Sequence, residues 1–251
     1  GQRLERAMTH MGIEVRKGHR WGRVHRAPSG RLLCDLADGS VLECEKLLFA
    51  AGRVGNSEGL GLEHVGVAPD DRGAIDVNES YQTSASHVYA VGDVIGFPAL
   101  ASVSMEQARV AVCHMFAIDY KRSVGEMLPY GIYTIPEVSC VGETEETCKA
   151  RNIPYVAGRA FYEHNARGLI QGDLEGMTKI IVHAPTRRIL GVHLIGDRAS
   201  ELVHVGQAVM HLGGTVDTLI EMVFNYPTLA ESYKYAAYAA LGALAQRAKS
   251  T

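Results

Sequence analysis

The sequence contains no apolar run that approaches the roughly 20 residues of a membrane-spanning helix. It also carries little net charge, −3 over 251 residues, and so no extended basic surface that would indicate nucleic-acid binding. The charged residues at its start are not followed by a hydrophobic segment, and we therefore expect no signal peptide in this sequence. It has no initiator methionine either, and we interpret the chain as a fragment or a processed protein.

The five cysteines form neither a C-x-x-C pair nor a metal-binding spacing. An odd number of cysteines in a large chain is typical of reduced thiols in the cytosol, and we expect them to pack as small hydrophobic side chains. Among the eleven histidines, His204 and His211 share one predicted helix, and His183 and His193 are expected to face each other across a hairpin. No carboxylate or thiol completes either pair, so we predict no metal site.

Hydrophobic residues make up 47% of the chain and charged residues 21%, which suits a globular protein with at least one core. In the first part of the chain, residues 1–53, the pattern predicts a helix, a short strand, a hairpin and a strand buried on both faces. The predicted ranges are 4–12 for the helix, 13–15 for the short strand, 31–36 and 41–44 for the hairpin, and 46–52 for the buried strand. This order is typical of the end of an α/β dinucleotide-binding domain.

The middle of the chain, residues 54–125, is rich in loops. We predict a short extended segment at 74–77, a strand at 87–91 and a helix at 103–116. The apolar face of this helix is predicted to consist of Val103, Ala108, Val112 and Phe116.

From residue 126 onward, strands and helices no longer alternate, which predicts an α+β fold with an antiparallel sheet. Strands are expected at 132–135, 137–142, 177–183 and 189–195, the last two as a hairpin. Helices are expected at 143–151, from Ser200 as N-cap, from Thr215, and at 229–248. The apolar face of the helix after Ser200 is predicted to be Leu202, Val205, Val209 and Leu212.

One stretch combines useful chemistry with a favourable position: the predicted strand at 87–91, the pair Gly92-Asp93, and the helix that follows. A glycine lets the backbone approach a ligand closely, and an aspartate accepts hydrogen bonds from hydroxyl groups. The N-terminus of the helix favours negative charge. These features indicate a site for a nucleotide-like ligand. The plainer interpretation is a strand that stops at a turn.

This stretch resembles the second flavin-binding motif of the FAD-dependent pyridine nucleotide–disulfide oxidoreductases. The resemblance implies that Asp93 holds the ribityl chain of FAD and that the backbone at Ala101 contacts the pyrimidine ring. It also implies that the helix stabilises charge on the reduced flavin. The string Ala50-Ala-Gly52-Arg53 is similar to the turn that closes the nicotinamide-dinucleotide domain of this family. Gly52 is accordingly expected near the bound NAD(P)H.

A third similarity lies in Phe224-Asn-Tyr226-Pro227-Thr228-Leu-Ala-Glu231. Dithiol members of the family carry His-Pro-Thr-x-x-Glu here, a histidine base oriented by the glutamate and contributed across a dimer interface. Tyr226 stands in the place of that histidine. A tyrosine has a reference pKa of about 10 and is a poor base for thiols at neutral pH. With no histidine to orient, we interpret Glu231 as forming a capping box with Thr228 at the start of the final helix. The Tyr226–Pro227 bond is a candidate for the cis form.

The chain contains neither the C-x-x-x-x-C pair of the dithiol members nor a G-x-G-x-x-G fingerprint, both of which this family carries in a preceding half. The string around Tyr226 is similar to that of members which dispense with the dithiol. What this resemblance implies is an oxidoreductase that transfers hydride from NADPH to NAD⁺ through bound FAD. No residue is assigned as catalytic, and Tyr226 is expected near the flavin of a partner subunit.

The resemblance further implies three parts. Residues 1–53 end an NAD(P)-binding domain, residues 54–125 return to an FAD-binding domain, and residues 126–251 form an interface domain through which a homodimer assembles. Two alternatives stay open. The first is another flavin-dependent enzyme, of the disulfide reductase or dihydrolipoamide dehydrogenase type. The second is a dimerisation fragment that is inactive on its own.

Overall fold

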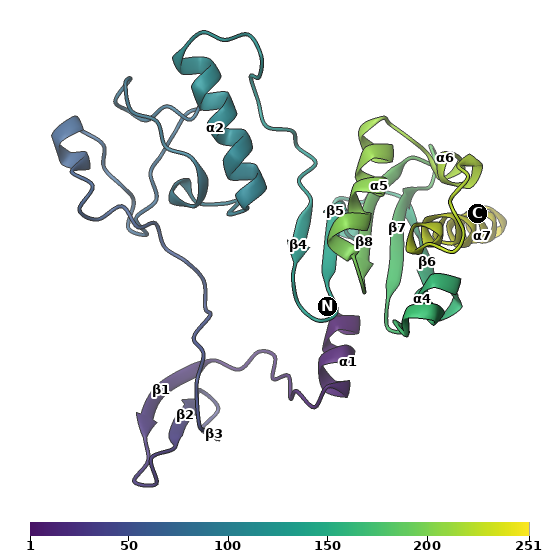
Figure 1. The fold of residues 1–251 in the computed structure, drawn as a ribbon, viewed down its shortest axis with the longest axis horizontal. Helices are drawn as coiled ribbons and strands as arrows, with labels where there is room; N and C mark the ends of the chain where they lie inside the picture. Colours follow the sequence, from purple (N-terminus) through teal and green to yellow (C-terminus); the bar gives the residue numbers. More distant parts are fainter. Residues whose placement is uncertain (251) are drawn as a thin grey trace. The chain divides into compact units, whose positions relative to one another are not determined.

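The computed structural model describes residues 1–250, which form two compact units, each with its own sheet (Figure 1). The larger unit combines residues 1–13 with the chain from residue 125 onward, and the smaller unit consists of residues 14–124. The predicted division into three parts does not coincide with these two units and stays a prediction.

The larger unit is built on a five-stranded sheet in the order β4-β5-β8-β7-β6, with every neighbouring pair antiparallel. This confirms the predicted α+β half with an antiparallel sheet. Its strands are β4 (Tyr130–Ile132), β5 (Val138–Gly142), β6 (Tyr155–Phe161), β7 (Met177–His183) and β8 (Ile189–Ile195).

The hairpin of β7 and β8 lies at the centre of this sheet, as the sequence predicts. Its register pairs Ile180 with Val192 and Thr178 with Leu194, so residues of the same parity share one face. Ile180, Val192 and Leu194 are buried. Their burial against the helices fixes the register, because a slip by one residue would turn this set toward the opposite face.

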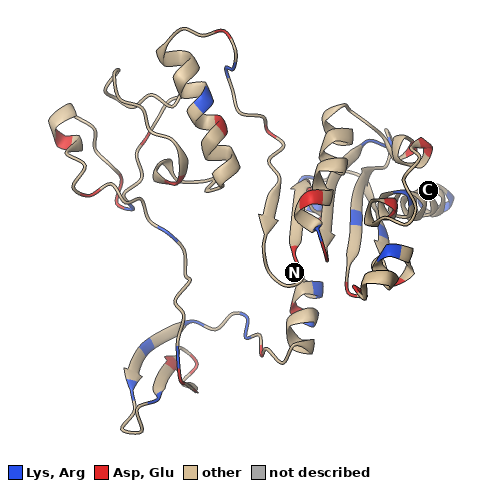
Figure 2. Cartoon of the chain, viewed as in Figure 1, with Lys and Arg blue, Asp and Glu red and all other residues tan. Residues whose placement is uncertain are grey.

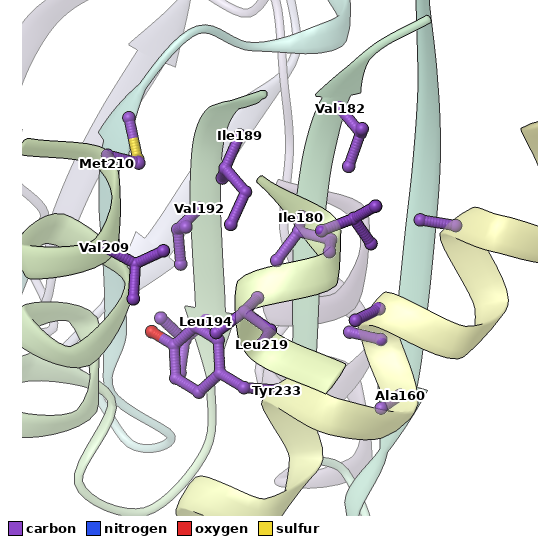
Figure 3. Packing of buried hydrophobic residues seen from close by; sticks show 14 of the residues in the cluster. Ala160, Ile180, Val182, Ile189, Val192, Leu194, Val209, Met210, Leu219 and Tyr233 are labelled. Carbon is purple, nitrogen blue, oxygen red and sulfur yellow. The ribbon is translucent and has the colours of Figure 1, made fainter. Parts of the chain in front are cut away.

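Helices cover one face of the sheet. Helix α5 packs against β8 and β5, while α7 packs against β6 and β7 and contacts α6. Figure 3 shows Leu219 of α6 and Tyr233 of α7 among the apolar side chains of β7 and β8. The helices of this unit are α1 (Gln2–His10), α3 (Glu145–Ala150), α4 (Ala166–Gln171), α5 (Ala199–His211), α6 (Val216–Glu221) and α7 (Ser232–Ser250).

The contact between α7 and β6 is close enough to require a glycine. A Cβ atom on Gly158 would lie 2.0 Å from the carbonyl oxygen of Ala236 and 2.8 Å from the Cβ of Ala240. Strand and helix therefore meet backbone to backbone, with only small side chains between them.

Helix α5 differs from the prediction in its cap and in its buried face. Its N-cap is Arg198, and Ser200 instead donates its hydroxyl to Glu137 Oε2 at 2.8 Å. Leu212, predicted to be buried, is 85% exposed. The face is rotated because Gly206 lies against β8, where a Cβ atom would come within 2.6 Å of Val192. The buried residues are Ala199, Val203, Gly206, Val209 and Met210.

The smaller unit contains a three-stranded antiparallel sheet, in the order β1-β2-β3. The predicted hairpin is confirmed: Leu32 pairs with Cys44, and at its turn Asp38 Oδ1 accepts the backbone N–H of Ser40 at 2.9 Å. The strands are β1 (Trp21–Arg26), β2 (Leu32–Leu36) and β3 (Val41–Cys44).

Within residues 1–125, three predicted strands do not form. Residues 13–15 and 46–52 have no regular structure, and Leu48, expected to be buried on both faces, is 90% exposed. Of residues 87–91, Tyr89 alone makes a bridge, to Gln82. A buried strand is stable only between hydrogen-bonded neighbours, and the described residues provide no sheet partner for residues 46–52.

Helix α2 (Ala101–Met115) confirms the predicted helix of the middle segment, although its buried face is different. Val112 and Phe116 are exposed. The helix follows two 3₁₀ turns, Leu62–Val65 and Gly92–Ile95. Its buried residues are Val103, Gln107, Val110, Ala111 and Cys113.

Candidate functional site

The Gly92-Asp93 pair begins the second of these 3₁₀ turns. Gly92 is buried and adopts φ +79°, a conformation that favours glycine. Its backbone N–H donates to the side-chain Oε1 of Gln107 on α2, at 2.7 Å. This bond holds the turn against the helix.

The same turn lies close to α2, so a side chain at position 92 would be crowded. A Cβ atom on Gly92 would lie 3.1 Å from Ser104 Oγ and 3.3 Å from Ser104 Cβ. The φ angle therefore favours glycine, and a Cβ atom would also require Ser104 to move by a few tenths of an ångström.

Helix α2 begins at Ala101, an exposed residue. The N-cap residue, Leu100, has no side-chain hydrogen bond to the first turn. The first N–H groups of a helix lack intrahelical partners and carry the positive end of the helix dipole. This end of α2 is therefore suited to an electron-rich ligand.

The carboxylate of Asp93 forms an ion pair with the guanidinium of Arg53, with 2.5 Å between Oδ2 and Nη1. The structure thus brings Asp93 next to the segment that contains Gly52. Gly52 itself is exposed, adopts φ +100°, and has open space where a Cβ atom would lie. Because both partners are solvent-accessible, the ion pair contributes little stability, about 0–1 kcal/mol. Asp93 can therefore exchange this partner at low cost.

Sequence reasoning missed Gln107 and Arg53. Gln107 is only 3% exposed, and its signal was a polar residue at helical spacing between Val103 and Val110, on the face that is buried. A buried amide needs a hydrogen-bond partner, and here the partner is Gly92. The sequence carries no comparable signal for the pairing of Arg53 with Asp93, which are 40 residues apart.

These residues fit the flavin and ribityl part of FAD, which the family resemblance implies. A Cβ atom at Gly92 would come within 3.1 Å of Ser104 Oγ. An exchangeable carboxylate matches a chain of hydroxyl groups, and the uncapped helix end matches a ring edge that gains negative charge. The assignments of Gly92, Asp93, Ala101 and Gly52 as cofactor-binding residues stay predictions.

The second predicted region is residues 223–228, here called the Tyr226 loop. Its Tyr226–Pro227 peptide bond is cis, and the Tyr226 side chain is 72% exposed. The hydroxyl of Thr228 donates to the carbonyl of Asn225 at 2.7 Å. The carbonyl of Thr228 accepts a hydrogen bond from Asn165 Nδ2 at 3.1 Å.

The predicted capping box of Thr228 and Glu231 does not form. A 3₁₀ turn, Leu229–Glu231, precedes α7, and its N-cap Thr228 makes no side-chain capping bond. Glu231 instead lies beside Tyr235, and its negative charge and hydrogen bond raise the pKa of the Tyr235 phenol. The family's histidine and glutamate positions are thus occupied by an exposed tyrosine and a carboxylate that faces a second tyrosine.

The predicted pairing of His183 with His193 is wrong. In the register of the sheet His183 lies opposite Tyr155 and His193 lies opposite Lys179. His193 hydrogen-bonds to the carbonyl of Glu143 at 2.9 Å, and burial lowers its pKa. Among residues 1–250 no three side chains of the His, Cys, Asp or Glu type gather as a metal site would require.

All five cysteines are free thiols, three of them buried. Burial raises the pKa of Cys140 and of Cys148, which keeps these thiols in the less reactive protonated form. Acidic and basic residues are interspersed along both units (Figure 2). None of the helices within residues 1–250 has the length and apolar character needed to cross a bilayer.

Two family models match this chain. The model described as pyridine nucleotide-disulphide oxidoreductase matches residues 1–112, and the model of the dimerisation domain of the same family matches residues 128–237. Together the two matches include both the Gly92-Asp93 turn and the Tyr226 loop.

Relatives named soluble pyridine nucleotide transhydrogenase, from Yersinia enterocolitica and Yersinia pestis, are 43% identical to this chain over 236 residues. Each match covers 93% of this chain and 50% of the relative. The chain therefore spans about half the length of the curated relatives it matches.

Solved structures show the same fold. LpdA from Mycobacterium tuberculosis has a TM-score of 0.83 at 28% identity, over 94% of this chain and 51% of its own. The HOCl-induced flavoprotein disulfide reductase RclA from Escherichia coli has a TM-score of 0.86 at 25% identity, over 92% of this chain and 53% of its own.

Proposed function

The chain belongs to the pyridine nucleotide-disulphide oxidoreductase family, and from this premise we propose that it is part of a flavoprotein that transfers hydride from NADPH to NAD⁺ through FAD. The observation that carries the proposal is 43% identity over 236 residues to soluble pyridine nucleotide transhydrogenases. Tyr226 supports it, because an exposed tyrosine in the place of the family's histidine does not provide a base for thiols at neutral pH.

FAD, when bound, would supply the redox chemistry for hydride transfer between the two nicotinamide nucleotides. The chain's own residues bind and orient. Asp93 accepts hydrogen bonds from the ribityl hydroxyls in exchange for Arg53, and Gly92 allows the backbone to lie against the cofactor. The first turn of α2, from Ala101, favours the negative charge of the reduced ring edge. Gly52 leaves space for the nicotinamide nucleotide.

The proposal extends to organisation and location. Residues 1–53 end the NAD(P)-binding domain, residues 54–125 belong to the FAD-binding domain, and residues 126–251 form the interface of a homodimer. The match to a dimerisation domain supports the homodimer, as do the exposed aromatic side chains of Tyr226, Tyr235 and Tyr238. A cytoplasmic location is supported by the name of the relatives, soluble transhydrogenase.

The test is made on the flavoprotein that contains this chain. We expect NADPH to reduce an NAD⁺ analogue whose reduced form absorbs at a distinct wavelength, and we expect no turnover of dihydrolipoamide or glutathione disulfide. Disulfide turnover without transfer between nucleotides would refute the proposal and favour the reductase alternative. A visible flavin absorption band in the purified 251-residue chain would rule out the inactive dimerisation fragment.

The cofactor assignment is tested by Asp93→Ala. Losing a charge-assisted hydrogen bond, about 1.5–3 kcal/mol, should weaken FAD affinity by about tenfold or more. The control is Asp76→Ala, which removes an equal charge from an exposed position in the same unit and should leave FAD affinity unchanged. Equal flavin content in the two variants would contradict the role of Asp93.

A further inference from the structure

Asn165 connects two segments of the larger unit that are far apart in the sequence. It follows β6 and a 3₁₀ turn, Tyr162–His164, and it is the N-cap of α4. Its side chain reaches the carbonyl of Thr228, 63 residues further along the chain. Asn165 is only 3% exposed, so its amide is satisfied by protein groups rather than by solvent.

The two ends of the Asn165 amide have separate tasks. Oδ1 accepts the backbone N–H groups of Arg167 and Gly168, at 3.0 and 3.1 Å, which caps α4. Nδ2 donates to the Thr228 carbonyl at 3.1 Å. The two backbone donors on one side and the carbonyl on the other fix the orientation of the amide.

Asn165 and α4 pack closely against the 3₁₀ turn that precedes them. The backbone N–H of Asn165 donates to the carbonyl of Tyr162 at 2.9 Å. A Cβ atom on Gly168 would lie 2.3 Å from that same carbonyl oxygen, so α4 is pressed against the turn without an intervening side chain. These contacts fix the backbone of Asn165, from which the amide side chain extends to the Tyr226 loop.

The chain just after the Tyr226 loop is anchored by a different contact. Ser232 donates its hydroxyl to the carbonyl of Leu229 at 2.6 Å and lies 2.7 Å from the hydroxyl of Thr178 on β7. That contact fixes the start of α7. Asn165 acts four residues earlier, at Thr228, two positions from the exposed ring of Tyr226.

We propose that Asn165 is a positioning residue, which fixes the Tyr226 loop by its hydrogen bond to the Thr228 carbonyl and thereby sets the position of Tyr226 for hydride transfer. The proposal rests on the proposed function and on the expectation, implied by the family resemblance, that Tyr226 lies near the flavin of a partner subunit. It does not make Asn165 a catalytic residue, because Asn165 acts through Thr228.

The decisive variant is Asn165→Asp, which separates the two tasks of the side chain. A carboxylate still accepts the N–H groups of Arg167 and Gly168, and aspartate is as good an N-cap as asparagine. It has no N–H to donate, and it turns an oxygen toward the Thr228 carbonyl. Asn165→Ala removes both tasks. Asn152→Asp adds the same charge at an exposed position of the same unit and is the matched control.

Hydrogen exchange on the flavoprotein tests whether the hydrogen bond from Asn165 protects the Tyr226 loop. In Asn165→Asp we expect amide exchange in residues 225–229 to accelerate by about tenfold, as loss of one buried hydrogen bond implies, while α4 keeps its protection. In Asn165→Ala both segments should exchange faster. In Asn152→Asp neither should change. Unchanged exchange in residues 225–229 of Asn165→Asp would overturn the proposal.

Steady-state kinetics test whether the position of the Tyr226 loop affects hydride transfer. We expect kcat for transfer from NADPH to fall by about tenfold in Asn165→Asp, with KM for NADPH within about twofold. Faster exchange with an unchanged kcat would also overturn the proposal. If the wild-type flavoprotein transfers no hydride, the proposed function fails, and the exchange data alone decide whether Asn165 holds the loop. Should Asn165→Asp fail to fold, Asn165→Ser, which keeps an uncharged capping oxygen, replaces it in both measurements.

Discussion

Replacing Gly92 by alanine tests whether the turn before α2 needs a glycine for stability and for FAD binding. Alanine adds two costs: the positive φ of +79° and a Cβ contact of 3.1 Å with Ser104 Oγ. The first cost applies to any glycine with a φ angle in the left-handed region, whereas the second is specific to this turn. A control that carries only the first cost can therefore separate them.

Gly66 provides that control. It lies in the same unit in the left-handed region, with φ +72°, and has open space where a Cβ atom would lie. For Gly66→Ala we expect about 1–2 kcal/mol of backbone strain. Reduced freedom of the unfolded chain offsets about 0.4–1 kcal/mol of this, so the net loss is about 1 kcal/mol.

For Gly92→Ala the crowding against Ser104 adds about 1–3 kcal/mol, as overpacking does in cores. The total loss is then about 2–4 kcal/mol. The turn has to move away from α2 to accommodate the methyl group, and this movement stretches the bond from Gly92 to Gln107. We expect FAD affinity to fall by about tenfold or more in Gly92→Ala and to change by less than about twofold in Gly66→Ala.

The assay combines urea denaturation with the dissociation constant of FAD, measured by quenching of flavin fluorescence. The double variant Gly92→Ala, Ser104→Ala removes the hydroxyl at 3.1 Å but leaves the Cβ at 3.3 Å, and should recover part of both losses. If Gly92→Ala and Gly66→Ala lose the same stability and the same FAD affinity, the close approach to α2 has no role and the argument is refuted.

Two further outcomes follow from the larger unit. Gly158→Ala on β6 should destabilise it by about 3 kcal/mol, because its Cβ would overlap the carbonyl of Ala236. Gly242→Ala, at an exposed position of α7, should stabilise it by up to about 1 kcal/mol. Thermal unfolding of both variants tests these values. Burial lowers the pKa of His193 below its ordinary 6.5, so the unfolded chain takes up a proton first and stability falls as the pH drops below about 6.5. His193→Gln, which keeps an N–H for the Glu143 carbonyl, should reduce this slope between pH 7.5 and 5.5, and parallel curves for variant and wild type would contradict it.

Local patterns predicted the elements whose partners are close in the sequence. The hairpin of β7 and β8 is an example, since alternation and the turn between the strands determine it together. Residues 46–52 show the opposite case. Their apolar run predicts a strand buried on both faces, but these residues are exposed, because a strand also needs hydrogen-bonded neighbours, which no local pattern can provide.

The candidate site was predictable in its chemistry but not in its contacts. Gly92 and Asp93 stand out by residue type, whereas the partners Gln107 and Arg53 depend on how the chain folds back on itself. Glu231 shows why spacing alone is insufficient. Its spacing from Thr228 fits a capping box, but the Thr228 hydroxyl donates to the Asn225 carbonyl, and the 3₁₀ turn changes where the helix begins.

The backbone contact between Gly158 and α7 has a consequence for the accuracy with which the chain places its own parts. Where two elements meet through long side chains, rotamer changes let their spacing drift by a fraction of an ångström. Here the spacing is set by main-chain atoms and alanine methyl groups, which have no rotamers to exchange. The position of α7 on β6 is therefore well defined. We expect substitutions elsewhere in the core to shift neither α7 nor the start of the Tyr226 loop that leads into it.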